Sequence, residues 1–221
     1  LAISQVPYYS TPKIRQPIIE DVDALAAILG MPSNTKKGLR DKTIMSTLYD
    51  SAMRVEELVS LTVGSVCMDH EDVAIRIHGK GNKERTVVLD EKTSALVRQY
   101  AGEFHPEREP VAPFFYTVVG GMRKHTTTRN VQKLIKKYSD KARADYDIPE
   151  SVSPHTFRRT RGSLLYRDGV DIEAVAVFLG HSDTKTTRDH YTSPSVQQLR
   201  EIANRRTEAI PETEQLWPDT T

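Results

Sequence analysis

The sequence predicts a mostly helical α+β domain with a small antiparallel three-stranded sheet. Apolar residues recur at helical spacing along most of the 221 residues. Strict alternation of apolar and other residues is confined to one stretch, where Val73, Ile75 and Ile77 occupy every second position. The length suits one sizeable domain with an arm or a tail.

The first half of the chain is predicted to begin with a linker and continue with short helices. Residues 1–17 contain three prolines and little periodicity, so we expect an extended linker there. Amphipathic spacing predicts a helix over 18–29, ended by GMPSNTKKG, and a second helix over 39–53. A further short helix is expected to begin near Arg54.

The sheet is predicted in the middle of the chain. The alternating stretch, the glycine-rich GKGN and the run ERTVVLD indicate a β-hairpin that carries Lys80 and Lys83 at its tip. A helix over 91–103 and a short strand over 113–116 (PFFY) follow. The remaining chain is predicted to form helices near 128–144, 154–167, 171–179, 184–191 and 194–206, before a polar, acidic tail.

Positive charge is concentrated in one part of a nearly neutral chain. The net charge is +1, yet residues 121–170 hold twelve lysines and arginines and only five acidic residues. This distribution is typical of a polyanion binder, although two solvated helix faces would give the same count. The lone Cys67 excludes an internal disulfide and a cysteine-based zinc site, and no apolar run reaches the roughly 20 residues that span a bilayer.

The stretch SPHTFRRTRGS, residues 153–163, has the features of an anion site at a helix start. Ser153 is a favourable N-cap and Pro154 suits the first helical position. His155 then lies in the first turn, and Arg158 follows three residues later on the same face. Free N–H groups and the positive end of the helix dipole favour a phosphate there, although surface arginines paired with acids would produce a similar pattern.

Two further clusters are ambiguous when each is taken alone. Arg54 and Glu57 lie one turn apart in SAMRVEELVSL, so the carboxylate can aim the guanidinium at a phosphate, or the two can form an ordinary ion pair. Lys80 at a hairpin tip can deliver a proton into a groove, or can be a solvated turn lysine. No P-loop pattern is present around it.

The last cluster is FLGHSDTKTTRDHYTS. Gly180 is predicted to end a helix and to present His181 just beyond it, and Tyr191 follows ten residues later beside Arg188 and His190. A tyrosine hydroxyl ionises near pH 10, so cationic neighbours would be needed to make it a nucleophile. The alternative is a structural tyrosine whose ring packs and whose hydroxyl finds a partner.

Taken in order, these residues resemble the catalytic set of the tyrosine recombinases, which include phage and transposon integrases and the resolvases of chromosome dimers. The likeness runs from about residue 18 to residue 204 and implies a fold of the DNA breaking-rejoining type. Two departures are visible: Arg159 replaces the family's usual histidine, and the interval from the last histidine to the tyrosine is ten rather than nine. The matching residues are Arg54, Lys80, His155, Arg158, His181 and Tyr191.

The resemblance implies a role for each of these residues. Tyr191 would attack a DNA phosphodiester to leave a 3′-phosphotyrosyl linkage, with Lys80 protonating the departing 5′ oxygen and His155 as an acid–base partner. Arg54, Arg158 and His181 would grip the non-bridging oxygens, and Glu57 would support Arg54 from behind. No metal, ATP or other cofactor is implied. The side chains expected to contact DNA are Lys83, Arg123, Lys124, Arg129, Arg159 and Arg161.

The resemblance also implies a domain organisation and partners. Residues 1–17 would be the linker to a core-binding domain that is absent here, 18–205 the catalytic domain, and 206–221 a tail that docks in a neighbouring subunit, with Leu216 and Trp217 as anchors. We expect double-stranded recombination sites as partners, a homotetramer on DNA that passes through a Holliday junction, and a monomer for the isolated domain. A bacterial or phage-encoded protein acting on the nucleoid in the cytoplasm, without membrane association, is expected.

Three alternatives remain open from the sequence. A type IB topoisomerase shares the catalytic set but would relax supercoils as a monomer. A catalytically inactive DNA-binding relative is compatible with the ten-residue interval. A metal-dependent nuclease is the third, and activity that survives EDTA would exclude it.

Overall fold

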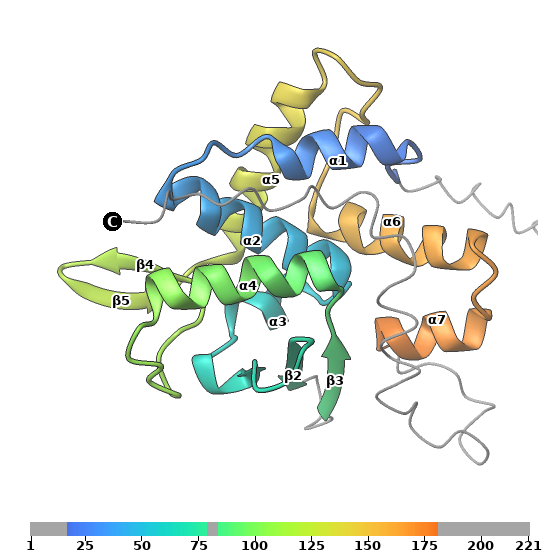
Figure 1. Ribbon diagram of the computed structural model, residues 1–221. Helices are drawn as coiled ribbons and strands as arrows, with labels where there is room; N and C mark the ends of the chain where they lie inside the picture. Colours follow the sequence, from blue (N-terminus) through green and yellow to red (C-terminus); the bar gives the residue numbers. More distant parts are fainter. Residues whose placement is uncertain (1–16, 79–83, 181–221) are drawn as a thin grey trace, which may run out of the picture.

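The structure, a computed structural model, describes residues 17–78 and 84–180 (Figure 1). Within this part of the chain no helix combines the length and the apolar character needed to cross a bilayer. The predicted linker over 1–17, except for Pro17, lies outside the described residues, as do the hairpin tip and the helices expected near 184–191 and 194–206. The described helices are α1 (Val22–Gly30), α2 (Lys36–Asp50), α3 (Val55–Val59), α4 (Glu91–Phe104), α5 (Thr128–Ala142), α6 (Pro154–Arg167) and α7 (Ile172–Leu179).

Helix α2 forms the centre of the core. It packs against α1, α4, α5 and α6, and almost every side chain from Leu39 to Asp50 is buried. Thr35 caps its start by accepting a hydrogen bond from the backbone N–H of Gly38. The predicted helix over 39–53 therefore begins three residues earlier and ends three residues earlier than expected.

The three-stranded antiparallel sheet is confirmed. Its order is β1 (Val66–Cys67), β2 (Ala74–His78) and β3 (Glu84–Val88). The alternating side chains of β2 are divided as the sequence predicts, with Ile75 and Ile77 buried and the positions between them facing outward. Across the pair, Ile75 lies opposite Val87.

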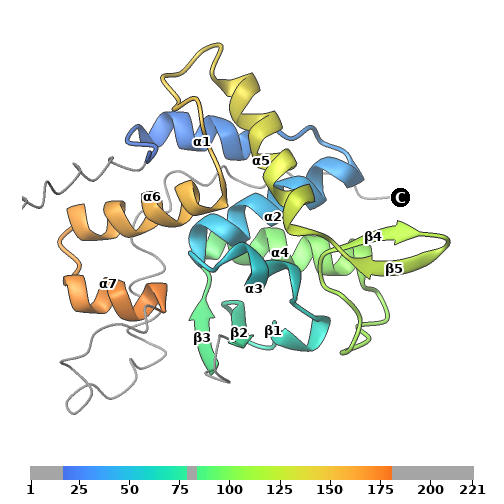
Figure 2. The same ribbon diagram turned by 180° about the vertical axis from the view of Figure 1, so that it is seen from behind.

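The second hairpin differs from the prediction. The segment PFFY was expected to be a strand, but Pro113 makes only an isolated bridge to Thr62, and Phe114 and Phe115 enter the core. The strands begin later, as β4 (Tyr116–Val119) and β5 (Met122–His125), joined at Gly120 and Gly121, both at positive φ. This hairpin projects from the body on the side away from α6 and α7 (Figures 1 and 2).

Helices α6 and α7 form a separate layer beside α2, and their bounds agree with the predicted 154–167 and 171–179. They approach closely because Gly162 has no side chain: a Cβ there would lie 3.1 Å from Leu179 Cδ1. Asp171 caps α7 through the N–H groups of Glu173 and Ala174, and Gly180 ends it in the left-handed conformation. The C-terminal end of α7 is thereby placed against α6.

Candidate active site

Ser153 and Pro154 begin α6 as the sequence predicts. Ser153 Oγ accepts a hydrogen bond from the backbone N–H of Thr156, and Thr156 Oγ1 accepts one from the N–H of Ser153 at 3.1 Å. This capping box satisfies two N–H groups at the helix start. It places an exposed His155 in the first turn and a buried Arg158 one turn further along.

Arg158 joins the ends of two helices that are distant in the sequence. Its guanidinium donates to the carbonyl of Ala52, just beyond α2, and to the carbonyl of Leu179, the last residue of α7. Ala52 has a φ of 48°, a conformation that costs a residue with a side chain about 1–3 kcal/mol. The surrounding structure maintains this conformation at the residue whose carbonyl binds Arg158.

The charge of Arg158 lies in an unfavourable environment. Its pKa is lowered to about 10, chiefly by burial and then by the charges of Arg54 and Arg85, while Glu57 acts in the opposite direction. A buried cation surrounded by other cations gains more from a bound anion than an exposed one would. The site is therefore suited to a negatively charged group.

Arg54 and Glu57 make the contact that their spacing predicts. Glu57 Oε2 accepts from the backbone N–H of Arg54 at 2.7 Å, and Oε1 accepts from the Arg54 guanidinium at 3.2 Å. A second guanidinium nitrogen of Arg54 lies 3.5 Å from the carbonyl oxygen of Gly180. Arg54 therefore links the start of α3 to the end of α7.

Arg85, which is not among the predicted site residues, belongs to the same cluster. From β3 it donates to both oxygens of Glu57, at 2.9 and 2.7 Å. A signal was present in the sequence: Arg85 alternates with Val87, and in the structure it lies opposite the buried Ile77. An arginine in the apolar row of a strand needs a buried partner, which indicates a polar cluster beneath the sheet.

Glu57 is the carboxylate of this cluster. Burial by itself would raise the pKa of Glu57, but hydrogen bonds from the Arg85 side chain and the Arg54 backbone, with the charges of both arginines, lower it below the usual value. Among the described residues, Arg54, Arg85 and Arg158 therefore surround one ionised carboxylate. The cluster has more positive than negative charge, and its most exposed arginine is Arg54.

Part of the predicted site falls outside the residues that the structure describes. Lys80, Lys83, His181 and Tyr191 lie outside the described residues. His181 follows Gly180 directly in the sequence, and Gly180 accepts from Arg54, so the chain leaves the described part of the molecule at the arginine cluster.

The basic side chains of the second hairpin and α5 are exposed. Arg123 lies over the ring of Tyr116, with 4.8 Å between its guanidinium carbon and the ring centroid, and Lys124 and Arg129 face outward. His125 Nδ1 lies 2.7 Å from the carbonyl of Val59 at the end of α3, and α5 also packs against α3. Figure 2 shows α3 and α5 on this face of the molecule. The exposed Arg123, Lys124 and Arg129 therefore lie on elements that contact α3, the helix that carries Glu57.

Arg161 is a correction to the predicted DNA-contact residues. Its side chain is 0% exposed and forms an ion pair with the equally buried Asp50 at 3.1 Å. Its guanidinium also lies over the ring of Tyr49, at 5.5 Å from the centroid. A side chain enclosed in this way cannot reach a phosphate on the surface, so Arg161 serves the core between α2 and α6.

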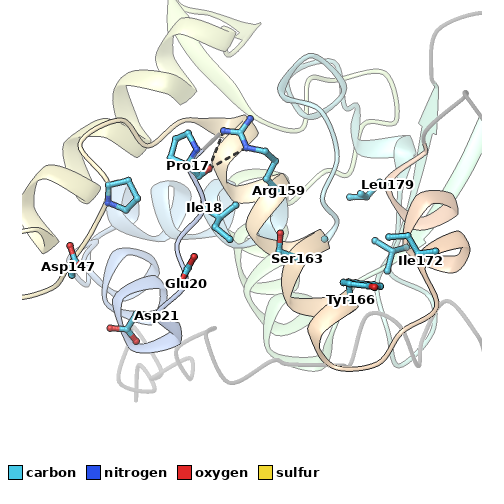
Figure 3. A pocket seen from close by; sticks show the side chains of 13 residues that line it. Pro17, Ile18, Glu20, Asp21, Asp147, Arg159, Ser163, Tyr166, Ile172 and Leu179 are labelled. Atoms are coloured by element: carbon cyan, nitrogen blue, oxygen red, sulfur yellow. Dashed lines mark hydrogen bonds between the residues drawn. The ribbon is translucent and has the colours of Figure 1, made fainter. Parts of the chain in front are cut away.

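Arg159 points to a groove on another side of α6 (Figure 3). Its guanidinium donates two hydrogen bonds of 3.3 Å to the carbonyl of Pro17. The groove has a volume of about 840 Å3 and is lined by the chain before α1 and by parts of α6 and α7, including Tyr166 and Ile172. In this conformation Arg159 holds the segment that precedes α1, and the backbone N–H of Ile19 adds a bond to Thr160 at 2.9 Å.

The sequence and structure were compared with known proteins. Residues 21–198 match the phage integrase family. Tyrosine recombinase XerD of Staphylococcus epidermidis is 34% identical over 197 residues, which are 87% of this chain and 64% of that protein. Tyrosine recombinase XerD of Staphylococcus aureus is 33% identical over 191 residues, 85% of this chain and 62% of that protein. The chain spans somewhat less than two thirds of the length of these curated relatives.

Solved structures share the fold. The integrase from mycobacterium phage Brujita superimposes with a TM-score of 0.66 at 18% identity, over 93% of this chain and 63% of that one. The XerA recombinase does so with a TM-score of 0.62 at 23% identity, over 93% and 66% of the two chains. With its arginine cluster, its mixed fold and a family match over most of its length, the chain belongs to the phage integrase family.

Proposed function

We propose that this protein is a site-specific tyrosine recombinase that cleaves and rejoins DNA through a covalent phosphotyrosyl intermediate. The observation that carries the proposal is the convergence of Arg54 and Arg158 on the end of α7, immediately before His181. Two arginines from separate helices, held by fixed carbonyl groups, form a preorganised site for the oxygens of one phosphate. Membership of the phage integrase family supports the same chemistry.

In the proposed reaction, the hydroxyl oxygen of Tyr191 attacks the phosphorus atom of a DNA backbone linkage. A bond forms between that oxygen and phosphorus, and the bond from phosphorus to the 5′ oxygen breaks. Lys80 delivers a proton to the departing 5′ oxygen, and His155 accepts the proton that the attacking tyrosine hydroxyl releases. The phosphate ester linkage is conserved, so a 5′-hydroxyl from another strand reverses the step without ATP.

The arginines stabilise the charge that accumulates on the non-bridging oxygens during attack. Losing one such donor typically costs about 2.7–4 kcal/mol in the barrier, or two to three decades in rate. Arg54 is the more accessible of the two and Arg158 the more buried. One donor therefore lies near the surface of the site and the other lies deeper in it. In this proposal the arginines and Lys80 supply the positive charge that divalent ions supply in other phosphoryl-transfer enzymes.

We further propose that the substrate is a pair of double-stranded recombination sites. Two related structures, the XerH recombinase on its difH substrate and the Tn1549 transposon integrase with circular intermediate DNA, are complexes with DNA. Exposed Arg123, Lys124 and Arg129 beside α3 would contact the DNA backbone here. Strand exchange in a homotetramer through a Holliday junction follows from the same proposal, as does action in the bacterial cytoplasm.

The proposed domain organisation predicts weak DNA binding by residues 18–205 alone. Residues 1–17 would connect to a core-binding domain, 18–205 would be the catalytic domain, and 206–221 would dock in a neighbouring subunit. Pro17 and Ile19 are hydrogen-bonded to α6, so the described chain before α1 lies against the helix that carries Arg158. A catalytic domain that binds DNA by itself, without a core-binding domain to complete a clamp, should show low affinity and little sequence preference.

The test is covalent trapping on a nicked duplex that carries the recombination site, in EDTA, with the protein at its full natural length. We expect a slower, protease-sensitive band on a denaturing gel that disappears in Tyr191→Phe. A band that persists in Tyr191→Phe would identify another nucleophile. Binding without any covalent band would favour the inactive relative, and relaxation of supercoiled DNA without paired sites would favour a topoisomerase.

A further inference from the structure

Glu57 is shared between two arginines, and the sharing is unequal. Each carboxylate oxygen accepts one hydrogen bond from Arg85 and one from Arg54. Arg85 uses two guanidinium nitrogens, at 2.9 and 2.7 Å, which is the paired geometry of a strong arginine–carboxylate contact. Arg54 uses its backbone N–H and a single guanidinium nitrogen at 3.2 Å. The carboxylate is therefore bound mainly by Arg85.

The exposure of the side chains also distinguishes Arg85 from Arg54. The side chain of Arg54 is 39% exposed, that of Arg85 19% and that of Glu57 8%. Arg85 lies beneath Gly180, where an added Cβ would be 3.0 Å from Arg85 Nε. Arg85 is thus the more buried partner of Glu57. Arg54 is the more exposed one, and only one of its guanidinium nitrogens contacts Glu57.

We propose that Arg85 is a positioning residue that keeps Glu57 from neutralising Arg54. With Arg85 present, Glu57 contacts the backbone N–H and one guanidinium nitrogen of Arg54. Most of the Arg54 guanidinium then remains available to a phosphate. Without Arg85, the buried carboxylate would lose its paired contact with a cation, and Arg54 would be the cation that could replace it. Arg54 would then turn inward to form a paired contact with Glu57 and would bind the substrate less well. The inference rests on the proposed recombinase function.

The first experiment replaces Arg85 with methionine, which keeps much of the side-chain volume beneath Gly180 and removes the guanidinium. We expect the single-turnover rate of covalent trapping to fall roughly ten- to a hundredfold, the loss typical of a residue that orients a functional group from behind. Binding of the uncleaved duplex should change by less than about threefold, because the exposed DNA contacts remain. Arg76→Met, an exposed arginine on the neighbouring strand β2, is the matched control and should retain the wild-type rate.

The decisive variant adds Glu57→Gln to Arg85→Met. If Arg85 acts by occupying Glu57, removing the negative charge frees Arg54, and the double variant should be at least several times faster than Arg85→Met alone. A residue that only stabilised the fold would give a double variant as slow as, or slower than, the single one. That result would overturn the proposal.

A second measurement does not depend on activity. In a crystal structure of Arg85→Met, we expect two guanidinium nitrogens of Arg54 to lie within hydrogen-bond distance of Glu57; an unchanged single contact would overturn the proposal. Should Arg85→Met not fold, Arg85→Gln takes its place in both experiments. If the wild-type protein binds DNA but shows no trapping that depends on Tyr191, the recombinase function fails, and the crystal structure still decides the role of Arg85.

Discussion

Gly180 lies directly against the guanidinium of Arg85, and a Cβ added to it would be 3.0 Å from Nε and 3.1 Å from Cζ. The same residue has a φ of 65° and its carbonyl accepts from Arg54. Its neighbour Leu179 accepts from Arg158. Two arginines therefore donate to the final carbonyls of one helix, where the helix dipole favours positive charge, and Gly180 allows the third to approach.

Gly180→Ala should disturb this contact as well as strain the backbone. Alanine at a positive φ costs about 1–2 kcal/mol, and the clash with Arg85 should add to it. Gly169→Ala is the control, because Gly169 has a φ of 84° but nothing within 4 Å of an added Cβ. We expect urea unfolding to show a larger loss for Gly180→Ala, and covalent trapping to slow only in that variant. Equal losses in both would mean that the contact with Arg85 is unimportant.

The buried pair of Arg161 and Asp50 should be sensitive to the loss of one partner. Arg161→Met leaves an uncompensated carboxylate in the core and should lower the free energy of unfolding by about 3–5 kcal/mol. Adding Asp50→Asn should recover part of this loss, since the amide oxygen can still accept from the backbone N–H of Asp90. Lys136→Met, which breaks a surface pair with Asp140, should cost at most about 1 kcal/mol. Urea titrations of the wild type and these three variants measure the differences in unfolding free energy.

The stabilisation that ionised Glu57 provides to the folded protein should be lost in acid. Its pKa is lowered in the folded state, so its contribution is complete above the ordinary glutamate value of about 4.3 and is lost as the pH falls through the lower folded value. The difference in unfolding free energy between wild type and Glu57→Gln should therefore shrink as the pH is lowered from about 7 to about 3. Glu56→Gln, at the exposed neighbouring position, should show no comparable trend. A constant difference for Glu57→Gln would contradict this prediction.

Arg129 is expected to contact a DNA phosphate at the start of α5. Arg129→Ala should reduce the slope of log Kd against log salt by about 0.9, the release of counterions from one phosphate contact. Lys36→Ala is the control: this exposed lysine at the start of α2 is already paired with Glu103, so its loss should leave the slope unchanged. Fluorescence anisotropy at several salt concentrations provides the slopes. An equal reduction in both variants would indicate only a general charge effect.

The elements that were predicted correctly have strong local signals. Ser153 and Pro154 specify the start of α6 through capping and a fixed φ, and the alternation of Val73, Ile75 and Ile77 specifies strand β2. The hairpin of β4 and β5 was missed because Val118, Val119 and Met122 are exposed, so no alternation marks it. Its Gly-Gly turn was the available signal.

The family, the mixed fold and the pairing of Arg54 with Glu57 can be predicted from the sequence, because they depend on residue order and on contacts within one turn. Only the tertiary structure separated the arginines of α6: Arg158 binds two helix ends, Arg159 holds the chain at Pro17, and Arg161 is enclosed with Asp50. Their neighbours in the sequence are nearly the same, but their partners lie more than 100 residues away for at least one contact of each. Burial of a charge depends on such distant partners, and local sequence does not encode them.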